Sequence, residues 1–304
     1  MPLVTMKSLL KHAVENKYAV GYFEAWNMES ILAVIDAAEE ADSPVIIGFG
    51  GSFIGNADRW IPESIFHYGA LGKAIAEGAR VPAALILNES DSLELLIKGL
   101  KAGFNAVMYQ DPEASWEEVI DINRYLVKTA HYFGADVEAE VGELPTSDIS
   151  TDTLKGGEKT DPGKAAYFVQ QTGIDALAIA AGNVHLLEGK KSSLDLKLIK
   201  SLRERTDIPL VLHGGTGISE DDLREAVSLG ICKVNVGTVL KRVFIKEVRG
   251  YFEKTDVDMT DPHDIVGKGG ALDMLSSARN AVKEEVLKYI KVLGSEKMAR
   301  CVKC

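Results

Sequence analysis

Residues 209–238 read PLVLHGGTGISEDDLREAVSLGICKVNVGT, and this stretch decides the fold. It contains two short apolar runs, Pro209–Gly214 and Cys232–Thr238, whose continuous hydrophobicity is typical of strands buried on both faces of a parallel sheet. Between them, Asp221–Gly230 begins with acidic residues and ends on a glycine, which is the asymmetry of a capped helix. The stretch therefore predicts a strand–helix–strand unit.

The same alternation extends over most of the chain. Six further runs predict buried strands: Tyr18–Phe23, Pro44–Phe49, Ala83–Asn88, Ala106–Gln110, Val137–Glu143 and Ala176–Gly182. Helical spacing of apolar residues marks Met28–Ala41, Leu93–Ala102, Trp116–Phe133, Val239–Phe252 and Leu272–Leu293. Eight strand–helix repeats predict an α/β fold, a (β/α)8 TIM barrel spanning residues 1–304 as one domain with a C-terminal helical extension. A doubly wound open sheet is the competing fold, but the Gly-x-Gly-x-x-Gly turn of a dinucleotide site does not follow the first strand.

Two segments interrupt this rhythm. Gly50–Gly78 holds an aromatic-rich insertion with Trp60, Phe66 and Tyr68. Pro145–Gly163 is polar and lacks apolar periodicity. Because long loops after barrel strands lie on the active-site face, this second segment is either a mobile lid or a solvated surface loop.

Composition narrows the classes of function. The 304 residues contain 34 Lys and Arg against 45 Asp and Glu, a formal net charge of −11. This balance argues against broad binding to nucleic acids or anionic membranes, both of which require a basic surface. No apolar run approaches the roughly 18 residues of a membrane helix, and three cysteines are too few for a disulfide framework, so we expect a cytoplasmic protein.

Polar residues gather where a barrel places its chemistry, at the C-terminal ends of the strands. His185 follows the sixth predicted strand and His213 lies near the end of the seventh, so both should point into the barrel mouth. Glu89 follows the third strand, while Glu138 and Glu140 lie two apart in the fifth and face the same way. Two imidazoles and a carboxylate suit zinc or a related divalent ion, which polarises a carbonyl and stabilises an enediolate without a Schiff-base lysine.

Two glycine-rich turns follow the seventh and eighth strands. One contains Gly214, Gly215 and Thr216, and the other contains Asn235, Gly237 and Thr238. Each leads from a strand into a helix, where backbone amides and the helix N-terminus attract an anion, and barrels commonly hold phosphate at this position. The alternative is that these glycines only close tight turns.

These residues resemble the class II ketose-bisphosphate aldolases, the group of fructose- and tagatose-bisphosphate aldolases, over nearly the whole chain. The segments that carry the resemblance are residues 18–23, 27–30, 137–142, 172–178, 210–217 and 230–238. The resemblance implies a barrel, a divalent metal (zinc, with manganese or iron as alternatives), no organic cofactor, dihydroxyacetone phosphate as the donor half of a phosphorylated substrate, and a homodimer or homotetramer. It also implies that His185, His213 and Glu140 bind the metal. By the same matching, Gly214, Thr216, Asn235, Gly237 and Thr238 contact the phosphate and donor sugar.

The third strand departs from the family pattern Leu-x-Leu-Asp-His, in which the aspartate is the proton donor and the histidine a metal ligand. Here the strand ends Leu87-Asn88-Glu89. Asn88 cannot transfer a proton at ordinary pH, so Glu24, Glu138 and Asp91 become candidates for that role. Glu89 can still bind metal, but as an oxygen ligand that weakens the Lewis acid and favours manganese or iron over zinc.

Other departures fall in the same mouth and indicate a reshaped substrate pocket. They are Met108-Tyr109-Gln110-Asp111-Pro112 after the fourth strand, Leu186, Val239, Gly50 and Glu24. Three hypotheses stay open: a class II aldolase-like lyase with altered specificity, an isomerase, epimerase or retro-aldolase acting on a different sugar or acid, and a catalytically inactive sugar-phosphate-binding paralogue.

Overall fold

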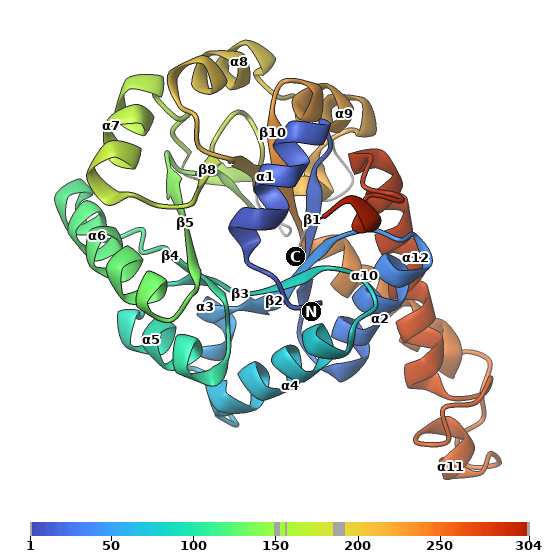
Figure 1. Cartoon of the computed structure of the whole chain (residues 1–304). Helices are drawn as coiled ribbons and strands as arrows, with labels where there is room; N and C mark the ends of the chain where they lie inside the picture. Colours follow the sequence, from blue (N-terminus) through green and yellow to red (C-terminus); the bar gives the residue numbers. More distant parts are fainter. Residues whose placement is uncertain (1, 149–152, 156, 185–191, 303–304) are drawn as a thin grey trace.

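A computed structural model describes residues 2–148, 153–155, 157–184 and 192–302. Eight parallel strands close into a barrel in the order β1-β10-β9-β8-β5-β4-β3-β2, and helices surround it (Figure 1). The predicted (β/α)8 barrel is confirmed. The open-sheet alternative is wrong, because β1 pairs with both β2 and β10 and leaves no free edge.

The barrel strands lie within three residues of their predicted ends. They are β1 Val20–Ala25, β2 Val45–Gly50, β3 Ala83–Ser90, β4 Ala106–Tyr109, β5 Asp136–Val141, β8 Ala176–Ile179, β9 Leu210–Leu212 and β10 Ile231–Val236. A separate antiparallel hairpin, β6 Thr146–Asp148 with β7 Thr153–Lys155, lies in the segment predicted as a loop or lid. Neither prediction for this segment included a hairpin, because its short polar strands carry no apolar alternation.

The predicted helices are present as α2 Met28–Glu40, α5 Leu93–Ala102, α6 Trp116–Tyr132, α9 Glu220–Ser228, α10 Thr238–Phe252 and α12 Met274–Leu293. Sequence periodicity missed α1 Met6–Asn16, α4 Ile65–Gly78, α7 Pro162–Thr172 and α8 Leu196–Arg205. Short helices also occur at α3 Gly51–Ile54 and α11 Pro262–Ile265. In α4, which lies within the predicted interruption, Gly69 and Gly72 form much of the buried face, so the helix lacks a stripe of large apolar residues.

Buried apolar residues form two clusters that correspond to the two layers of the fold. The larger lies between the strands and the surrounding helices. The smaller fills the barrel interior with Tyr22, Ile46, Ile86 and their neighbours, and α1 adds Leu9 and Leu10 to it. Since the backbone of Val4 bonds to Ala83 at the start of β3, α1 closes the end of the barrel where the strands begin (Figure 1). The candidate functional site is therefore expected at the opposite end of the barrel, where the strands finish.

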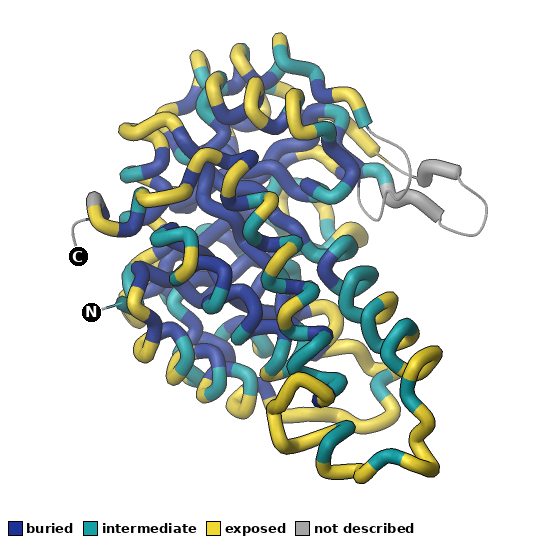
Figure 2. Tube along the Cα trace, turned by 90° about the vertical axis from the view of Figure 1, so that its right-hand side faces the viewer, coloured by how far each residue is buried: buried dark blue, intermediate teal, exposed yellow. Residues whose placement is uncertain are grey.

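The chain beyond β10 forms an arm. Figures 1 and 2 show the segment between α10 and α12, which includes α11, extending away from the barrel with mostly exposed residues. Val257, Met259 and Leu272 are exposed hydrophobic residues on it. Helix α12 returns and packs against α2. The assignment of all 304 residues to one domain with a C-terminal extension stays a prediction.

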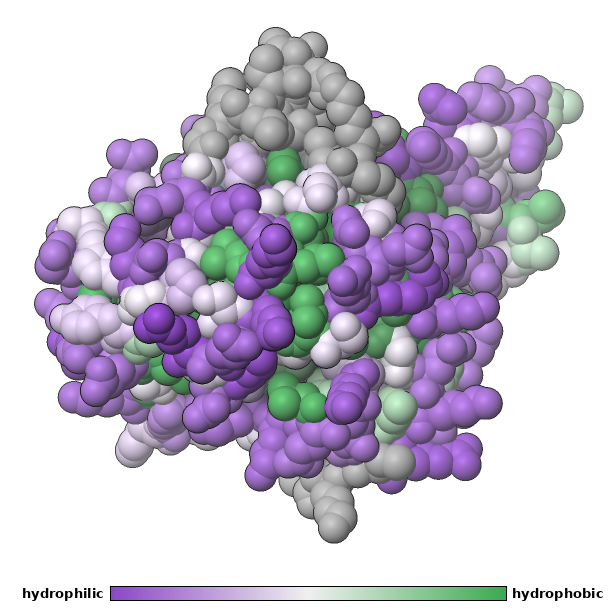
Figure 3. Space-filling view, turned by 90° about the horizontal axis from the view of Figure 1, so that it is seen from above, coloured by the Kyte–Doolittle hydropathy of each residue, from purple (hydrophilic) through white to green (hydrophobic). Residues whose placement is uncertain are grey.

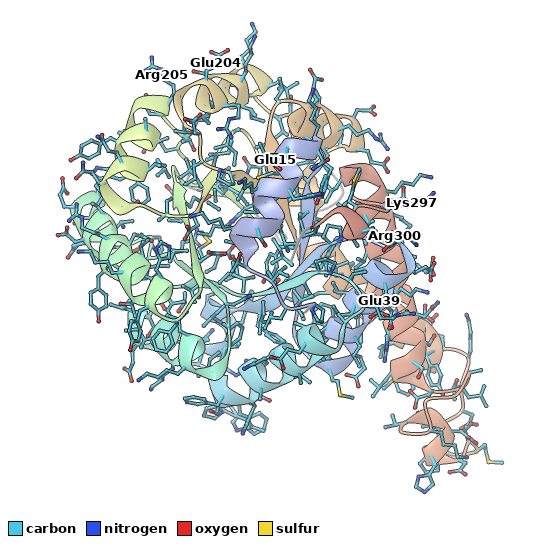
Figure 4. All side chains as sticks on the ribbon, in the orientation of Figure 1. Glu15, Glu39, Glu204, Arg205, Lys297 and Arg300 are labelled. Atoms are coloured by element: carbon cyan, nitrogen blue, oxygen red, sulfur yellow. The ribbon has the colours of Figure 1, made fainter. Side chains whose placement is uncertain are left out.

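The outer surface is largely hydrophilic. Seen from above, hydrophilic side chains surround a small group of hydrophobic ones (Figure 3). Glu204 and Arg205 at the end of α8 point away from the barrel (Figure 4). Within the described ranges, none of the helices combines the length and hydrophobicity needed to cross a membrane.

Candidate active site

A cavity of about 360 Å³ lies at the C-terminal ends of the strands. Residues of β1, β3 and β10, the turns that follow β9 and β10, and the first turns of α10 line it. Six residues predicted for the phosphate or proton-transfer roles are among its lining residues: Glu24, Gly214, Thr216, Asn235, Gly237 and Thr238. Asn88, Glu89 and His213 line it as well, so side chains far apart in the sequence meet in one place.

His213 is the fully buried centre of this cavity wall. Its Nε2 lies 2.9 Å from Oε1 of Glu138, and its Nδ1 lies 3.1 Å from Oε1 of Glu89. Burial alone lowers the pKa of His213, but the hydrogen bonds to Glu138 and Glu89 outweigh burial and raise this pKa to about 10. The Glu138 carboxylate therefore orients the ring through Nε2, while the Glu89 carboxylate faces Nδ1.

Glu138 belongs to a buried ion pair beneath the mouth. Lys233 Nζ, on β10, lies 2.8 Å from Glu138 Oε2 and donates to Oδ1 of Asn235 at 2.6 Å. Burial raises the pKa of Glu138, but Lys233 and His213 more than offset it, so the net pKa is lowered and the carboxylate is charged. Glu138 was predicted to transfer protons; the structure places it among His213 and Lys233, outside the residues that line the cavity.

Glu89 is held in an unusual backbone conformation. Its φ is +53°, a left-handed value that is rare for residues other than glycine and common at functional sites. The pairing of β3 with β4 shifts register between Leu87 and Ser90, so the strand bulges at this point. The bulge turns the Glu89 carboxylate toward His213, and the preceding Asn88 is 4% exposed at the cavity wall.

Glu140 lies at a second cavity of about 360 Å³ next to β4 and β5. Gln110 donates from Nε2 to Oε2 of Glu140 at 2.7 Å, while the buried Oε1 of Glu140 has no hydrogen-bond partner among the described residues. Burial, together with the nearby charges of Glu89 and Glu138, raises the pKa of Glu140 to about 7. This free carboxylate oxygen is the kind of group that a metal ion satisfies.

Glu24 lines the first cavity beside the glycine-rich turn that follows β10. Its Oε2 lies 2.9 Å from Nζ of Lys241 on α10. A side chain at Gly237 would come within 2.4 Å of this carboxylate, and one at Gly50 within 2.8 Å. Burial raises the pKa of Glu24, and Lys241 partly opposes the shift. Both glycines are therefore needed to admit the carboxylate.

The two glycine-rich turns have the geometry of tight backbone approaches. Gly214 has a φ of +67°, and a Cβ there would lie 2.5 Å from the carbonyl oxygen of Val184. Gly215 opens a short 3-10 turn to Gly217, and the Thr216 hydroxyl accepts from the backbone N–H of Val239. Gly237 has no side chain with which to cap α10, and of the first backbone amides of this helix Val239 already donates to Thr216.

His185 and Leu186 lie outside the described residues, so the predicted pair of metal-binding histidines is not placed. Among the residues that are described, no three His, Cys, Asp or Glu side chains gather closely enough to hold a metal. The donors that are placed suit a divalent ion when it displaces the proton on Nδ1 of His213, because this nitrogen faces Glu89 and an oxygen of Glu140 lacks a partner.

Sequence reasoning missed several residues of this site. Lys233 is one, although a lysine inside the apolar run Ile231-Cys232-Lys233-Val234 was a usable signal, because a buried lysine requires a partner. Tyr22, Phe53, Lys241 and Arg242 also line the cavity. The last three come from a segment without clear periodicity and from a helix face that sequence alone does not orient.

Comparison with known proteins supports the resemblance. The profile of the family described as "Fructose-bisphosphate aldolase class-II" matches residues 4–298. The chain is 34% identical over 304 residues to a probable fructose-bisphosphate aldolase of Bacillus subtilis (strain 168), covering 98% of this chain and all of that protein. It is 31% identical over 298 residues to the D-tagatose-1,6-bisphosphate aldolase subunit GatY of Klebsiella oxytoca, covering 97% and 99% of the two chains.

A third relative has a solved structure. The uncharacterized protein YdjI of Escherichia coli (strain K12) is 35% identical over 284 residues, covering 93% of this chain and 95% of that protein. The crystal structure described as the YdjI aldolase superposes with a TM-score of 0.81 at 33% identity over 98% of this chain and 99% of that one.

Proposed function

Because this chain belongs to the class II fructose-bisphosphate aldolase family, we propose that it is a lyase that reversibly cleaves a phosphorylated ketose, with dihydroxyacetone phosphate as the donor half. The observation that carries this proposal is the position of His213. Its ring lies between Glu138 and Glu89 in the wall of a cavity that also contains both glycine-rich turns. This arrangement supports metal-assisted chemistry beside a phosphate.

The family is generally metal-dependent, and we assign the metal to His185, His213, Glu89 and Glu140. When bound, a zinc-type ion supplies electrophilic stabilisation of the negative charge that develops on the ketone oxygen during cleavage. Glu138 acts through His213 by accepting from Nε2, which holds the ring and its tautomer. Because two of the four ligands are carboxylates, manganese and iron are the alternatives to zinc.

The phosphate half of the substrate fits the turns after β9 and β10. Backbone amides at Gly214, Gly215 and Gly237, the hydroxyls of Thr216 and Thr238, and the N-terminus of α10 together supply donors for an anion. Lys241 and Arg242 add positive charge to the same cavity. Lys241 is paired with Glu24, and together with Arg242 it places cations locally at the cavity of a chain whose net charge is −11.

We assign proton transfer to Glu24. Asn88 stands where the family has an aspartate and supplies only hydrogen bonds to the substrate. Glu138 is held by Lys233 and His213, whereas Glu24 lines the cavity and burial raises its pKa above the ordinary value, which favours proton exchange with a substrate. Asn88 at the position of the family's aspartate, together with the departures at Glu24, Gly50 and Val239, supports a specificity different from that of the bisphosphate aldolases.

A substrate panel tests the proposal. Purified protein loaded with zinc, manganese or iron is incubated with ketose 1,6-bisphosphates and ketose 1-phosphates, and release of dihydroxyacetone phosphate is measured. We expect release from at least one monophosphate or bisphosphate and loss of release after chelation. A metal-loaded protein that is inert on the whole panel would contradict the proposal. Turnover confined to 2-oxo acids or epimerisation would favour the isomerase, epimerase or retro-aldolase alternative.

Catalytic inactivity with intact sugar-phosphate binding is the remaining alternative, for which the replacement of the acid by Asn88 is the motivating observation. Calorimetric titration with dihydroxyacetone phosphate in parallel with the turnover assay separates it from a lyase. The family resemblance further supports a homodimer or homotetramer in the cytoplasm, which size-exclusion chromatography and cell fractionation test.

A further inference from the structure

Three polar atoms on the floor of the first cavity have no hydrogen-bond partner among the described residues. They are Oη of Tyr22, Oδ1 of Asn88 and Nδ2 of Asn235. Their residues are 2%, 4% and 7% exposed, so the surrounding protein excludes bulk water from them. Buried polar groups are nearly always satisfied in folded proteins, and three unsatisfied ones lining a single cavity indicate a polar ligand.

The strand pairing brings these residues to one face. Tyr22 on β1 and Asn235 on β10 are direct register partners, so their side chains project from the same side of the sheet into the barrel. Asn88 lies near the end of β3, two strands away in the other direction, and pairs with Gly50 on the intervening β2. All three side chains line the first cavity.

Lys233 fixes how Asn235 presents its amide. The ammonium donates to Oδ1 of Asn235 at 2.6 Å, so the Nδ2 end of the amide is the one that faces the cavity as a donor. The same ammonium lies 5.0 Å from the centre of the Tyr22 ring, in the range of a cation–π contact. Tyr22 and Asn235 are thus positioned by one buried cation.

The Tyr22 hydroxyl is a hydrogen-bond donor on the cavity floor. Burial, with added contributions from Glu24, Glu89 and Glu138, raises the pKa of Tyr22 well above its ordinary value, so the phenol stays neutral and available as a donor. The floor then presents two donors, on Tyr22 and Asn235, and one acceptor, on Asn88. Two donors suit a carbonyl oxygen, and the acceptor suits an adjacent hydroxyl, which together make up a hydroxyketone.

We propose that Tyr22 is a substrate-contacting residue whose hydroxyl donates a hydrogen bond to an oxygen of the hydroxyketone half of the substrate. This inference rests on the proposed function, since it takes a ketose phosphate as the ligand. It adds to that function a residue that neither the motif matching nor the metal site identified. It also gives Asn88 a role: its acceptor holds the hydroxyl next to the carbonyl.

The test replaces the hydroxyl alone. Zinc-loaded Tyr22→Phe is compared with the parent chain and with Tyr18→Phe, which removes another buried phenol at the opposite end of the barrel, where Tyr18 pairs with His12. With the best ketose phosphate of the panel, we expect Tyr22→Phe to lower kcat/KM by about 10²-fold, as loss of one transition-state donor does. Tyr18→Phe should leave kcat/KM within about twofold of the parent value.

Binding measurements separate a contact from a structural effect. By calorimetry, Tyr22→Phe should weaken dihydroxyacetone phosphate binding by roughly tenfold, as loss of one hydrogen bond does, and should leave inorganic phosphate binding unchanged. Equal weakening of both ligands, or equal losses in Tyr22→Phe and Tyr18→Phe, overturns the inference in favour of general destabilisation. Parent-like kinetics and binding in Tyr22→Phe also overturn it, while leaving the proposed function intact. A parent chain that neither binds nor releases dihydroxyacetone phosphate defeats the proposed function itself, and the inference with it.

Discussion

The backbone conformation of Glu89 decides where its carboxylate lies. The bulge at the end of β3 and the left-handed φ of +53° turn its carboxylate to within 3.1 Å of His213. A strained conformation persists only where the surrounding structure enforces it, and such positions concentrate at functional sites. This conformation supports the proposal that Glu89 is a metal ligand.

Metal binding should depend on this carboxylate. Glu89→Ala removes one assigned ligand, and we expect the affinity for zinc to fall more than about tenfold, because even loss of a group that only supports a ligand costs 10- to 100-fold. Competition with a chromogenic chelator measures it. Glu94→Ala, on the exposed first turn of α5, is the control and should bind zinc like the parent. Unchanged affinity in Glu89→Ala would remove Glu89 from the metal site.

The free energy of unfolding should depend on Lys233, because this residue neutralises the buried carboxylate of Glu138. Lys233→Met leaves the charge of Glu138 buried without its cation, and loss of one partner of a buried pair costs about 3–5 kcal/mol of unfolding free energy. Urea denaturation measures this cost. Adding Glu138→Gln to Lys233→Met should recover part of the loss, because the buried charge is then gone. A Lys233→Met protein as stable as its parent would show that the pair contributes nothing.

At the scale of elements, a buried carboxylate joins α1 to β5. The backbone N–H of Lys7 on α1 donates to Oδ2 of Asp136 at the start of β5, at 2.6 Å. Burial raises the pKa of Asp136 from 3.8 to about 6, and the hydrogen bond from Lys7 only partly opposes this shift. The folded state therefore binds a proton more tightly than the unfolded state does.

This shift predicts a pH dependence with a definite sign. Below pH 3.8, Asp136 is protonated in both the folded and the unfolded state. Between pH 3.8 and about 6 the folded state keeps this proton while the unfolded state loses it, so the free energy of unfolding falls. Above pH 6 the total loss is about 3 kcal/mol. Asp136→Asn should remove this loss, so its stability relative to the parent should increase between pH 4 and pH 6 and then level off. Thermal unfolding across pH 4–8 checks it, with the exposed Asp121→Asn as control. A pH-independent difference would mean that Asp136 is not perturbed.

At the scale of the whole molecule, stability and chemistry lie at opposite ends of the barrel. Helix α1 fills the end where the strands begin, and the candidate site occupies the end where they finish. This division is general for barrels of this kind, because the loops that follow the strands are free to vary while the other end maintains the fold.

Leu9→Ala tests the separation. Leu9 is fully buried at the closed end, so the substitution should lower the unfolding free energy by about 2–5 kcal/mol through lost contacts and a residual cavity. Activity measured well below the melting temperature should keep the parent kcat/KM. A large loss of kcat/KM in a protein that is still folded, as judged by circular dichroism, would show that the two ends are coupled.

Continuous apolar runs predicted all eight strands of the barrel and the strand ends that carry His213, Glu89 and Asn235, because burial on both faces of a strand is encoded locally along the chain. Apolar periodicity predicted most of the helices. It missed α1, α4, α7 and α8, where glycines or polar residues dilute the apolar pattern. The partnership of Glu138 with Lys233, the turning of Glu89 toward His213 and the meeting of Tyr22 with Asn235 depended on strand register and on a bulge. These pairs join residues up to 213 positions apart, and only closure of the barrel brings such distant residues side by side.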